Sequence, residues 1–158
     1  AGLADEFPNW NVELWGAEDG KAYYKELQLL IKRNHLENRV FLKGPTNDVP
    51  SVLQQGDIFA FPSAYEGFSL ALGEAMSMGL PAIGYRSCSA VNELIKDGEN
   101  GYLCDDGVEP LRISMKRLMS SLSIRVSLGE KARIDMKKYS SEVIWNTWEN
   151  LLKRIVKQ

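Results

Sequence analysis

Short apolar runs alternate with helical patterns between Val12 and Cys104, and this alternation restricts the fold more than any other feature of the sequence. Each run has the length and the β-branched or aromatic content of a buried strand. The predicted strands are Val12–Trp15, Val40–Leu42, Ile58–Phe61, Ala82–Tyr85 and Tyr102–Cys104, and the predicted helices are Lys21–Asn34, Pro50–Gln55, Leu70–Met78 and Ala90–Lys96. Strands connected by helices pair in parallel through right-handed crossovers. We therefore expect an α/β fold with a doubly wound, Rossmann-like parallel sheet and helices on both faces.

The strands stop after Gly107, and the remaining residues are predicted to form three C-terminal helices. These are Val108–Leu122, Ile124–Lys138 and Glu142–Val156. In the first helix, Val108, Leu111, Met115, Leu118 and Leu122 recur at three- and four-residue spacing. Such a stripe is typical of a helix face that packs on a core. We expect the three helices to cover the sheet, although the apolar stripe of the last one suits an interdomain surface equally well.

The composition is that of a globular domain. The chain has 158 residues, of which 44% are hydrophobic, and this is enough for one core, so a single domain over residues 1–158 is expected. The net charge of −2 gives no reason to expect a nucleic-acid partner. Two cysteines without a signal peptide favour a reducing compartment with both thiols buried. No apolar run reaches the length of a membrane span, so we expect a cytoplasmic location without membrane contact by this segment.

The segment Ala64–Pro81 combines two spaced carboxylates, a glycine-containing turn and the start of a helix. The preceding strand leads into this turn at its carboxyl end, which is the edge where open α/β sheets bind ligands. Ser69 is a predicted N-cap, because its hydroxyl can accept a hydrogen bond from an otherwise unpaired N–H group. Gly79 is a predicted left-handed C-cap, and Pro81 blocks continuation of the helix.

The first turn of this helix presents free N–H groups beside Gly67, which together with the helix dipole suit a phosphate or diphosphate. Glu66 lies in the turn, and Glu74 lies about one and a half turns into the helix. A carboxylate only accepts hydrogen bonds, so each suits a vicinal pair of hydroxyls on a ribose or hexose. Two solvated helix carboxylates are the ordinary explanation of such a pair. The residues around them favour a nucleotide-sugar site.

A resemblance to a known family rests on Glu66-Gly67-Phe68-Ser69-Leu70, Glu74-Ala75-Met76 and Gly79-Leu80-Pro81. This segment resembles the E-x7-E signature of family 4 retaining glycosyltransferases, group 1 type, in the C-terminal donor-binding domain of their GT-B fold. The similarity also includes Trp10–Gly16, Asn38–Gly44 and Asn92–Gly101. It implies that Glu74 binds the nucleotide ribose and Glu66 the hydroxyls of the donor sugar. It also implies that the amides of Phe68, Ser69 and Leu70 approach the diphosphate.

The resemblance implies transfer of a sugar from a nucleotide diphosphate sugar to a glycan or lipid-linked acceptor, as in polysaccharide biosynthesis. No metal and no cofactor are expected. Helix amides and basic residues would stabilise the charge on the departing diphosphate, with Glu66 as the candidate catalytic residue. A nucleophilic role for Glu66 is disfavoured, because no second carboxylate in the motif is placed to serve as its acid partner.

The family begins this domain with a strand and a helix that carry a Gly-Arg and a Lys-Gly motif, and this sequence has no counterpart of either. Ala1–Phe7 resembles the end of that helix. The first strand of the domain and the N-terminal acceptor domain are therefore expected to be missing. Loss of a central strand leaves two strand edges open. We expect the isolated, truncated chain to bind its donor weakly and to be inactive, and membrane association of a full-length enzyme through its acceptor is left open.

Two alternatives remain at this point: a fragment of a GT-B-like sugar-nucleotide epimerase, and a non-catalytic α/β interaction module. An epimerase needs acid and base residues around its cleft, and the lone His35 follows a helix without partners at metal-ligand spacing. An interaction module does not need both Glu66 and Glu74. Ser87–Ala90 stands where the family commonly has a glycine pair, so the preference for a sugar or acceptor stays undetermined, as does the nucleobase.

Overall fold

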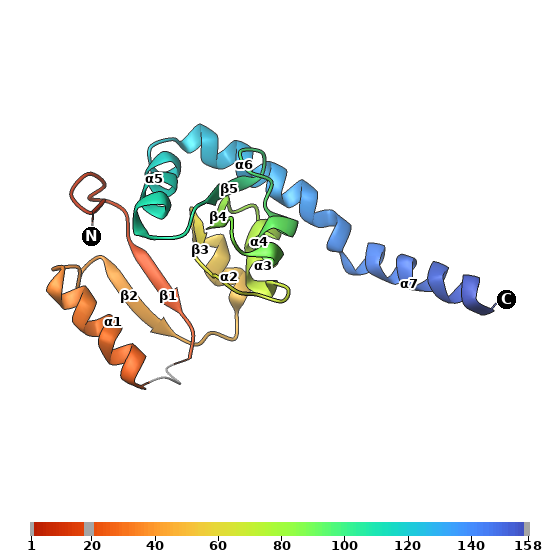
Figure 1. Cartoon of the computed structure of the whole chain (residues 1–158), viewed down its shortest axis with the longest axis horizontal. Helices are drawn as coiled ribbons and strands as arrows, with labels where there is room; N and C mark the ends of the chain where they lie inside the picture. The colour runs from red at the N-terminus through yellow and green to blue at the C-terminus, as the bar shows by residue number, and fades with distance from the viewer. Residues whose placement is uncertain (1, 18–20, 157–158) are drawn as a thin grey trace. The chain divides into compact units, whose positions relative to one another are not determined.

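The structure is a computed structural model that describes residues 2–17 and 21–156. The chain divides into two compact units, with unit 1 ending at Val49 and unit 2 beginning at Pro50. Figure 1 shows the elements of both units in the colours of their sequence positions.

Unit 1 contains β1 (Val12–Trp15), α1 (Lys21–Arg33) and β2 (Val40–Gly44). The two strands lie side by side and run in parallel (Figure 1). Val12 is opposite Val40 and Leu14 is opposite Leu42. The Arg39 guanidinium holds the segment before β1, because it donates hydrogen bonds to the carbonyl oxygens of Ala4 (3.1 Å), Phe7 (2.7 Å) and Trp10.

Ala1–Phe7 was expected to be the end of a helix, but residues 2–7 form only a turn. Its one i to i−4 backbone bond runs from the Phe7 amide to the Leu3 carbonyl (3.0 Å), and Ala1 lies outside the described residues.

Unit 2 is built on a parallel sheet of β3 (Phe59–Phe61), β4 (Ala82–Tyr85) and β5 (Gly101–Cys104), in the order β3-β4-β5. Its other elements are α2 (Val49–Gln54, which starts one residue earlier), α3 (Leu70–Ser77), α4 (Ser89–Leu94), α5 (Val108–Met119), α6 (Leu122–Met136), the 3-10 helix η1 (Lys137–Tyr139) and α7 (Ser141–Val156). The predicted strands and helices all exist, with ends within a few residues of those expected.

Apolar side chains of successive strand residues enter two cores on opposite faces of the three-stranded sheet. Ala82 packs in one core with Leu72 of α3 and Val91 of α4. Ile83 packs in the other with Leu118 of α5, and α6 contributes Ala132 to the first core and Leu128 to the second. This arrangement confirms the expected α/β fold with helices on both faces.

The described strands form two parallel sheets, β1-β2 in unit 1 and β3-β4-β5 in unit 2. In the predicted strand order, β1 and β3 are the neighbours of the strand that is expected to be missing, and its absence stays a prediction. Both are edge strands in the structure. Residues 12 to 15 of β1 are all exposed, including the apolar side chains of Val12 and Leu14.

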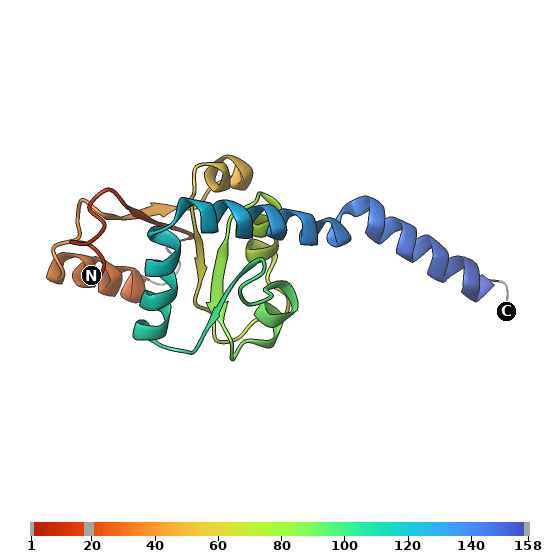
Figure 2. The same cartoon turned by 90° about the horizontal axis from the view of Figure 1, so that it is seen from above.

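The expected covering of the sheet by three C-terminal helices is confirmed for α5 and α6 and wrong for α7. All described side chains of α7 are exposed, and Figure 2 shows this helix continuing past the end of α6. The predicted stripe of the first C-terminal helix is shorter than expected, because α5 ends at Met119. Leu118 is buried and Leu111 and Met115 pack on the same core, whereas Val108 and Leu122 are exposed.

Candidate nucleotide-sugar site

The candidate site lies on one continuous segment of unit 2, the loop from β3 to α3 and the first turns of α3. β3 ends at Phe61, and α3 begins at Leu70 with Ser69 as its N-cap. Ser69 is 3% exposed, and its Oγ accepts a hydrogen bond from the Leu72 amide (3.3 Å). The predicted N-cap is therefore confirmed, and the loop ends at a buried, fixed residue.

The predicted end of the helix is confirmed as well. Gly79 has a φ of +85°, in the left-handed region that favours glycine, and its amide donates to the Met76 carbonyl (3.0 Å). Leu72, Ala75 and Met76 of α3 are fully buried. The helix is thus anchored in the core along one side, and its opposite side is free to face a ligand.

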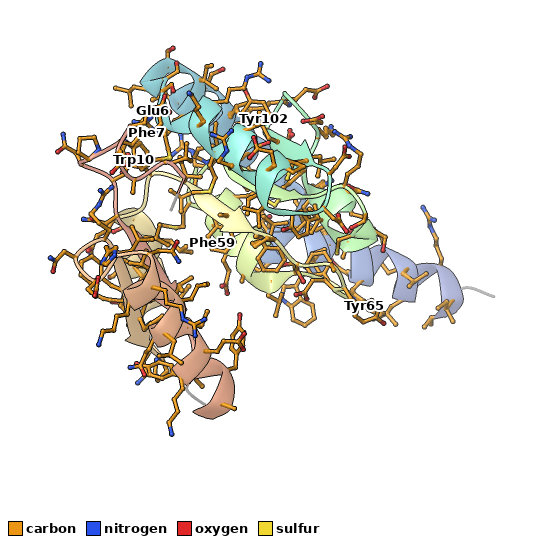
Figure 3. The ribbon with its side chains drawn as sticks, turned by 60° about the vertical axis from the view of Figure 1, so that its left-hand side comes forward. Glu6, Phe7, Trp10, Phe59, Tyr65 and Tyr102 are labelled. Carbon is orange, nitrogen blue, oxygen red and sulfur yellow. The ribbon has the colours of Figure 1, made fainter. Side chains whose placement is uncertain are left out.

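Glu66 is half-buried in the loop and is held by a neighbour that the sequence reasoning missed. The Ser63 hydroxyl donates to Glu66 Oε1 (3.0 Å) and also lies 3.2 Å from the Tyr65 carbonyl oxygen. In the sequence, the two residues stand three positions apart as Ser63-Ala64-Tyr65-Glu66. Tyr65 itself is 90% exposed, and Figure 3 places it at the outer margin of the molecule.

Glu74 is an exposed residue of α3, in the second turn as predicted. Its carboxylate takes part in no hydrogen bond or ion pair with the residues that the structure describes. Both of its oxygens are therefore available to hydroxyl donors of a ligand.

The start of α3 also offers unpaired backbone donors. Within residues 2–17 and 21–156, the N–H groups of Phe68, Ser69 and Leu70 have no acceptor. Beside them, a Cβ built on Gly67 would have no atom within 4 Å, so a ligand can approach the backbone there. Unpaired amides and the positive end of the helix dipole are suited to an anion.

The edge formed by the ends of β4 and β5 carries an ion-pair network. Arg86 donates to Asp97 Oδ2 (2.7 Å) and to the Leu103 carbonyl oxygen (2.9 Å). The hydrogen bond to Asp97 raises the pKa of Arg86. Burial raises the pKa of Asp97, but hydrogen bonds from Arg86 and from the Leu103 amide outweigh it and leave that pKa below its ordinary value. Ser87, within the segment that departs from the family pattern, donates to Asp106 Oδ1 (2.6 Å).

A hollow of about 160 Å³ lies in unit 1, and none of the predicted site residues lines it. It is lined by Leu14, Leu27, Leu30, Ile31, Asn34, Leu36 and Val40. Such an apolar lining offers little to a diphosphate or a sugar.

The remaining candidate residues have structural roles. Cys88 and Cys104 are both buried as free thiols, as expected, and burial raises the pKa of Cys104. His35 is exposed, with a φ of +54° two residues after α1 ends at Arg33, which confirms its expected position at the surface and near a helix end. In the described part of the chain, no three His, Cys, Asp or Glu side chains are grouped to hold a metal ion. Among the described helices, none combines the length and hydropathy needed to cross a bilayer.

Comparison with known proteins identifies a family for this chain. The family model described as "Glycosyl transferases group 1" matches residues 1–135. An uncharacterised glycosyltransferase of Haemophilus influenzae is 28% identical over 151 residues, which are 95% of this chain and 42% of the relative. The N-acetyl-alpha-D-glucosaminyl L-malate synthase of Bacillus anthracis is 33% identical over 135 residues, 84% of this chain and 35% of the relative.

Among solved structures, HepE of Anabaena in complex with UDP and glucose superposes with a TM-score of 0.83 and 26% sequence identity. The match covers 91% of this chain and 40% of HepE. The chain therefore spans less than half the length of each of these three proteins.

Proposed function

The chain belongs to the glycosyl transferases group 1 family, and we propose that it is the donor-binding part of a retaining glycosyltransferase. The substrate is a nucleotide diphosphate sugar, and the acceptor is a glycan or a lipid-linked sugar. The observation that carries this proposal is the segment Ser63–Glu74. It brings together a carboxylate oriented by a hydroxyl, a second carboxylate, and amides at a helix start. The second carboxylate and these amides have no partner among the residues that the structure describes.

Each part of this segment has its own task in the proposed site. Glu74 accepts hydrogen bonds from the ribose hydroxyls, and Glu66 accepts them from the hydroxyls of the sugar. The amides of Phe68, Ser69 and Leu70, next to Gly67, donate to the diphosphate. These donors stabilise the negative charge that grows on the diphosphate as the glycosidic bond breaks, which is electrostatic catalysis. Glu66 is the candidate catalytic residue because, in the proposed site, its carboxylate binds the sugar that is transferred.

Units 1 and 2 are proposed to form one donor-binding domain, since the family match of residues 1–135 includes both. An N-terminal acceptor-binding domain is the proposed partner, in keeping with relatives more than twice as long as their matched part. Polysaccharide biosynthesis in the cytoplasm is the proposed setting. The isolated chain is proposed to bind its donor without catalysing transfer.

Saturation-transfer NMR of the chain with UDP, GDP and ADP sugars tests the proposal. We expect saturation of the ribose protons of one nucleotide, and loss of that signal in Glu74→Gln. The matched control is Glu130→Gln, which removes a carboxylate from an exposed position of α6 in the same unit and is expected to bind as wild type. An equal loss in both variants, or no saturation of any donor, would contradict the proposed site and favour the alternative of a non-catalytic interaction module.

An epimerase fragment is the less favoured alternative, because His35 is an exposed residue near a helix end in unit 1, and an exposed position does not indicate a role in proton transfer. Release of an epimerised sugar nucleotide in the same NMR samples would favour that alternative.

A further inference from the structure

The loop of the candidate site is contacted by an aromatic residue that is 71 positions away from it in the sequence, since Phe68 meets Tyr139. The two rings are 5.8 Å apart between centroids, and their planes make an angle of 68°, which is an edge-to-face arrangement. This geometry is a favoured one for aromatic pairs, because the positive edge of one ring meets the negative face of the other. Phe68 is 46% exposed and Tyr139 is 38% exposed, so neither ring belongs to the core.

Tyr139 is itself fixed from two sides. It is the last residue of η1, which follows directly on Met136, a buried residue of the core shared by α3, α4 and α6. The Lys138 ammonium lies 4.7 Å from the centroid of the Tyr139 ring, a cation–π contact. The ring therefore stands on a short helix that is anchored in the core of unit 2.

The loop has separate attachments at its two ends. Ser63 holds Glu66 at the first end, and the buried cap Ser69 holds the second. Between them, Gly67 has no side chain, so Phe68 supplies the contact to the rest of unit 2. The position of Phe68 thus affects the Glu66 carboxylate two residues before it and the three amides that begin with its own.

We infer that Tyr139 is a positioning residue for the donor site, acting through Phe68 on the Glu66 carboxylate and on the amides of Phe68–Leu70. This inference rests on the proposed function. Tyr139 touches no part of the donor in it, whereas Glu74 is held independently by the buried side of α3. Loss of the Tyr139 ring should therefore weaken binding of the diphosphate and the sugar, and spare binding of the nucleoside.

The test compares Tyr139→Leu with Tyr139→Phe, using uridine, UDP and UDP-glucose as probes in ligand-detected NMR titrations of the chain. For Tyr139→Leu we expect the Kd of UDP-glucose to rise by about 2- to 10-fold, the range that an aromatic pair supports, while the Kd of uridine stays the same. Tyr139→Phe keeps the ring and is expected to bind all three probes as wild type. Trp145→Leu, which removes an exposed ring from α7, is the matched control and is expected to change none of the Kd values.

A double-mutant cycle provides the second readout. Phe68→Leu in the Tyr139→Leu background should cost no further affinity for UDP-glucose, because the two rings act through one contact. Unchanged UDP-glucose binding by Tyr139→Leu would overturn the inference, as would equal losses for uridine and UDP-glucose or fully additive losses in the cycle. If the wild-type chain binds none of the UDP, GDP and ADP sugars tested under Proposed function, then the proposed function fails and this inference fails with it.

Discussion

The carbonyl oxygen of Gly79 lies against Gly129, so close that a Cβ built on Gly129 would overlap it. This contact joins the end of α3, the helix of the candidate site, to the middle of α6. The atom that the added methyl group would overlap belongs to the backbone, which cannot move aside as a flexible side chain can. We therefore expect Gly129→Ala to lower the free energy of unfolding by about 1–3 kcal/mol, the usual cost of overpacking. Chemical denaturation followed by circular dichroism measures the change.

Gly73→Ala is the matched control, since Gly73 is also a helical glycine but a Cβ there would have no atom within 4 Å. Alanine in a helix interior is favoured over glycine by about 0.5–1 kcal/mol, so this variant is expected to be stabilised. Destabilisation of both variants to the same extent would show that the close approach of Gly79 and Gly129 is not the cause.

Gly67→Ala tests whether a glycine at position 67 is needed for donor binding or for folding stability. Gly67 does not have the left-handed backbone conformation that restricts substitution, and a Cβ there meets nothing within 4 Å. The free energy of unfolding should therefore change by less than about 0.5 kcal/mol. The added methyl group points into space proposed for the diphosphate, so we expect weaker UDP binding, measured by NMR titration against wild type. Wild-type affinity for UDP would argue that the diphosphate does not approach Gly67.

Much of unit 2 follows from local sequence rules. Ser69 and Gly79 are N-cap and left-handed C-cap as predicted, because the first has a side chain that accepts from free amides and the second tolerates a positive φ. The alternation of apolar runs and helical patterns predicted the parallel strands. Both kinds of prediction succeed because residues close together in the sequence determine caps and strands.

Contacts between distant residues were not predictable in this way. The pairing of Phe68 with Tyr139 depends on how α6 lies on the sheet, and nothing in either neighbourhood indicates it. The apolar stripe of α7 predicted a packing face, either on the sheet or at a domain interface. Ile144 and Trp148 do not pack on the sheet and are exposed, because hydrophobic spacing identifies a face without saying what covers it. The roles of Glu66 and Glu74 stay predictions, since they depend on a ligand.

Asp135 gives the stability of unit 2 a predictable pH dependence. The pKa of Asp135 is lowered mainly by the hydrogen bond from Lys131 (2.7 Å), while burial opposes this and a hydrogen bond from the buried Asn100 (3.0 Å) adds to it. A carboxyl whose folded pKa lies below its unfolded value, about 3.9, stabilises the fold fully above that value. The contribution is lost as the pH falls through the folded pKa. We therefore expect unfolding by urea to become easier below about pH 4.

Asp135→Asn should lower stability at pH 7 and weaken the dependence on pH in the acid range. Glu130→Gln, which removes a carboxylate from the same helix without a contact to Asn100, is the control and should leave both unchanged. A pH profile of Asp135→Asn that runs parallel to the wild-type profile would assign the acid sensitivity to other carboxyl groups.

Ser63→Ala tests whether the hydrogen bond to Glu66 serves the donor sugar. The Ser63 hydroxyl fixes Oε1 of Glu66 and leaves the other oxygen for a sugar hydroxyl, so its loss frees the carboxylate to rotate. A hydrogen bond to a charged group contributes about 1.5–3 kcal/mol, and part of this is expected to appear as a higher Kd for UDP-glucose with that of UDP unchanged. Ser77→Ala is the control, since it removes a hydroxyl that bonds the Glu74 carbonyl (2.7 Å) and touches neither carboxylate. If Ser63→Ala binds UDP-glucose as wild type while Glu66→Gln does not, then Glu66 recognises the sugar without this orientation, because the carboxylate would be held by the ligand alone.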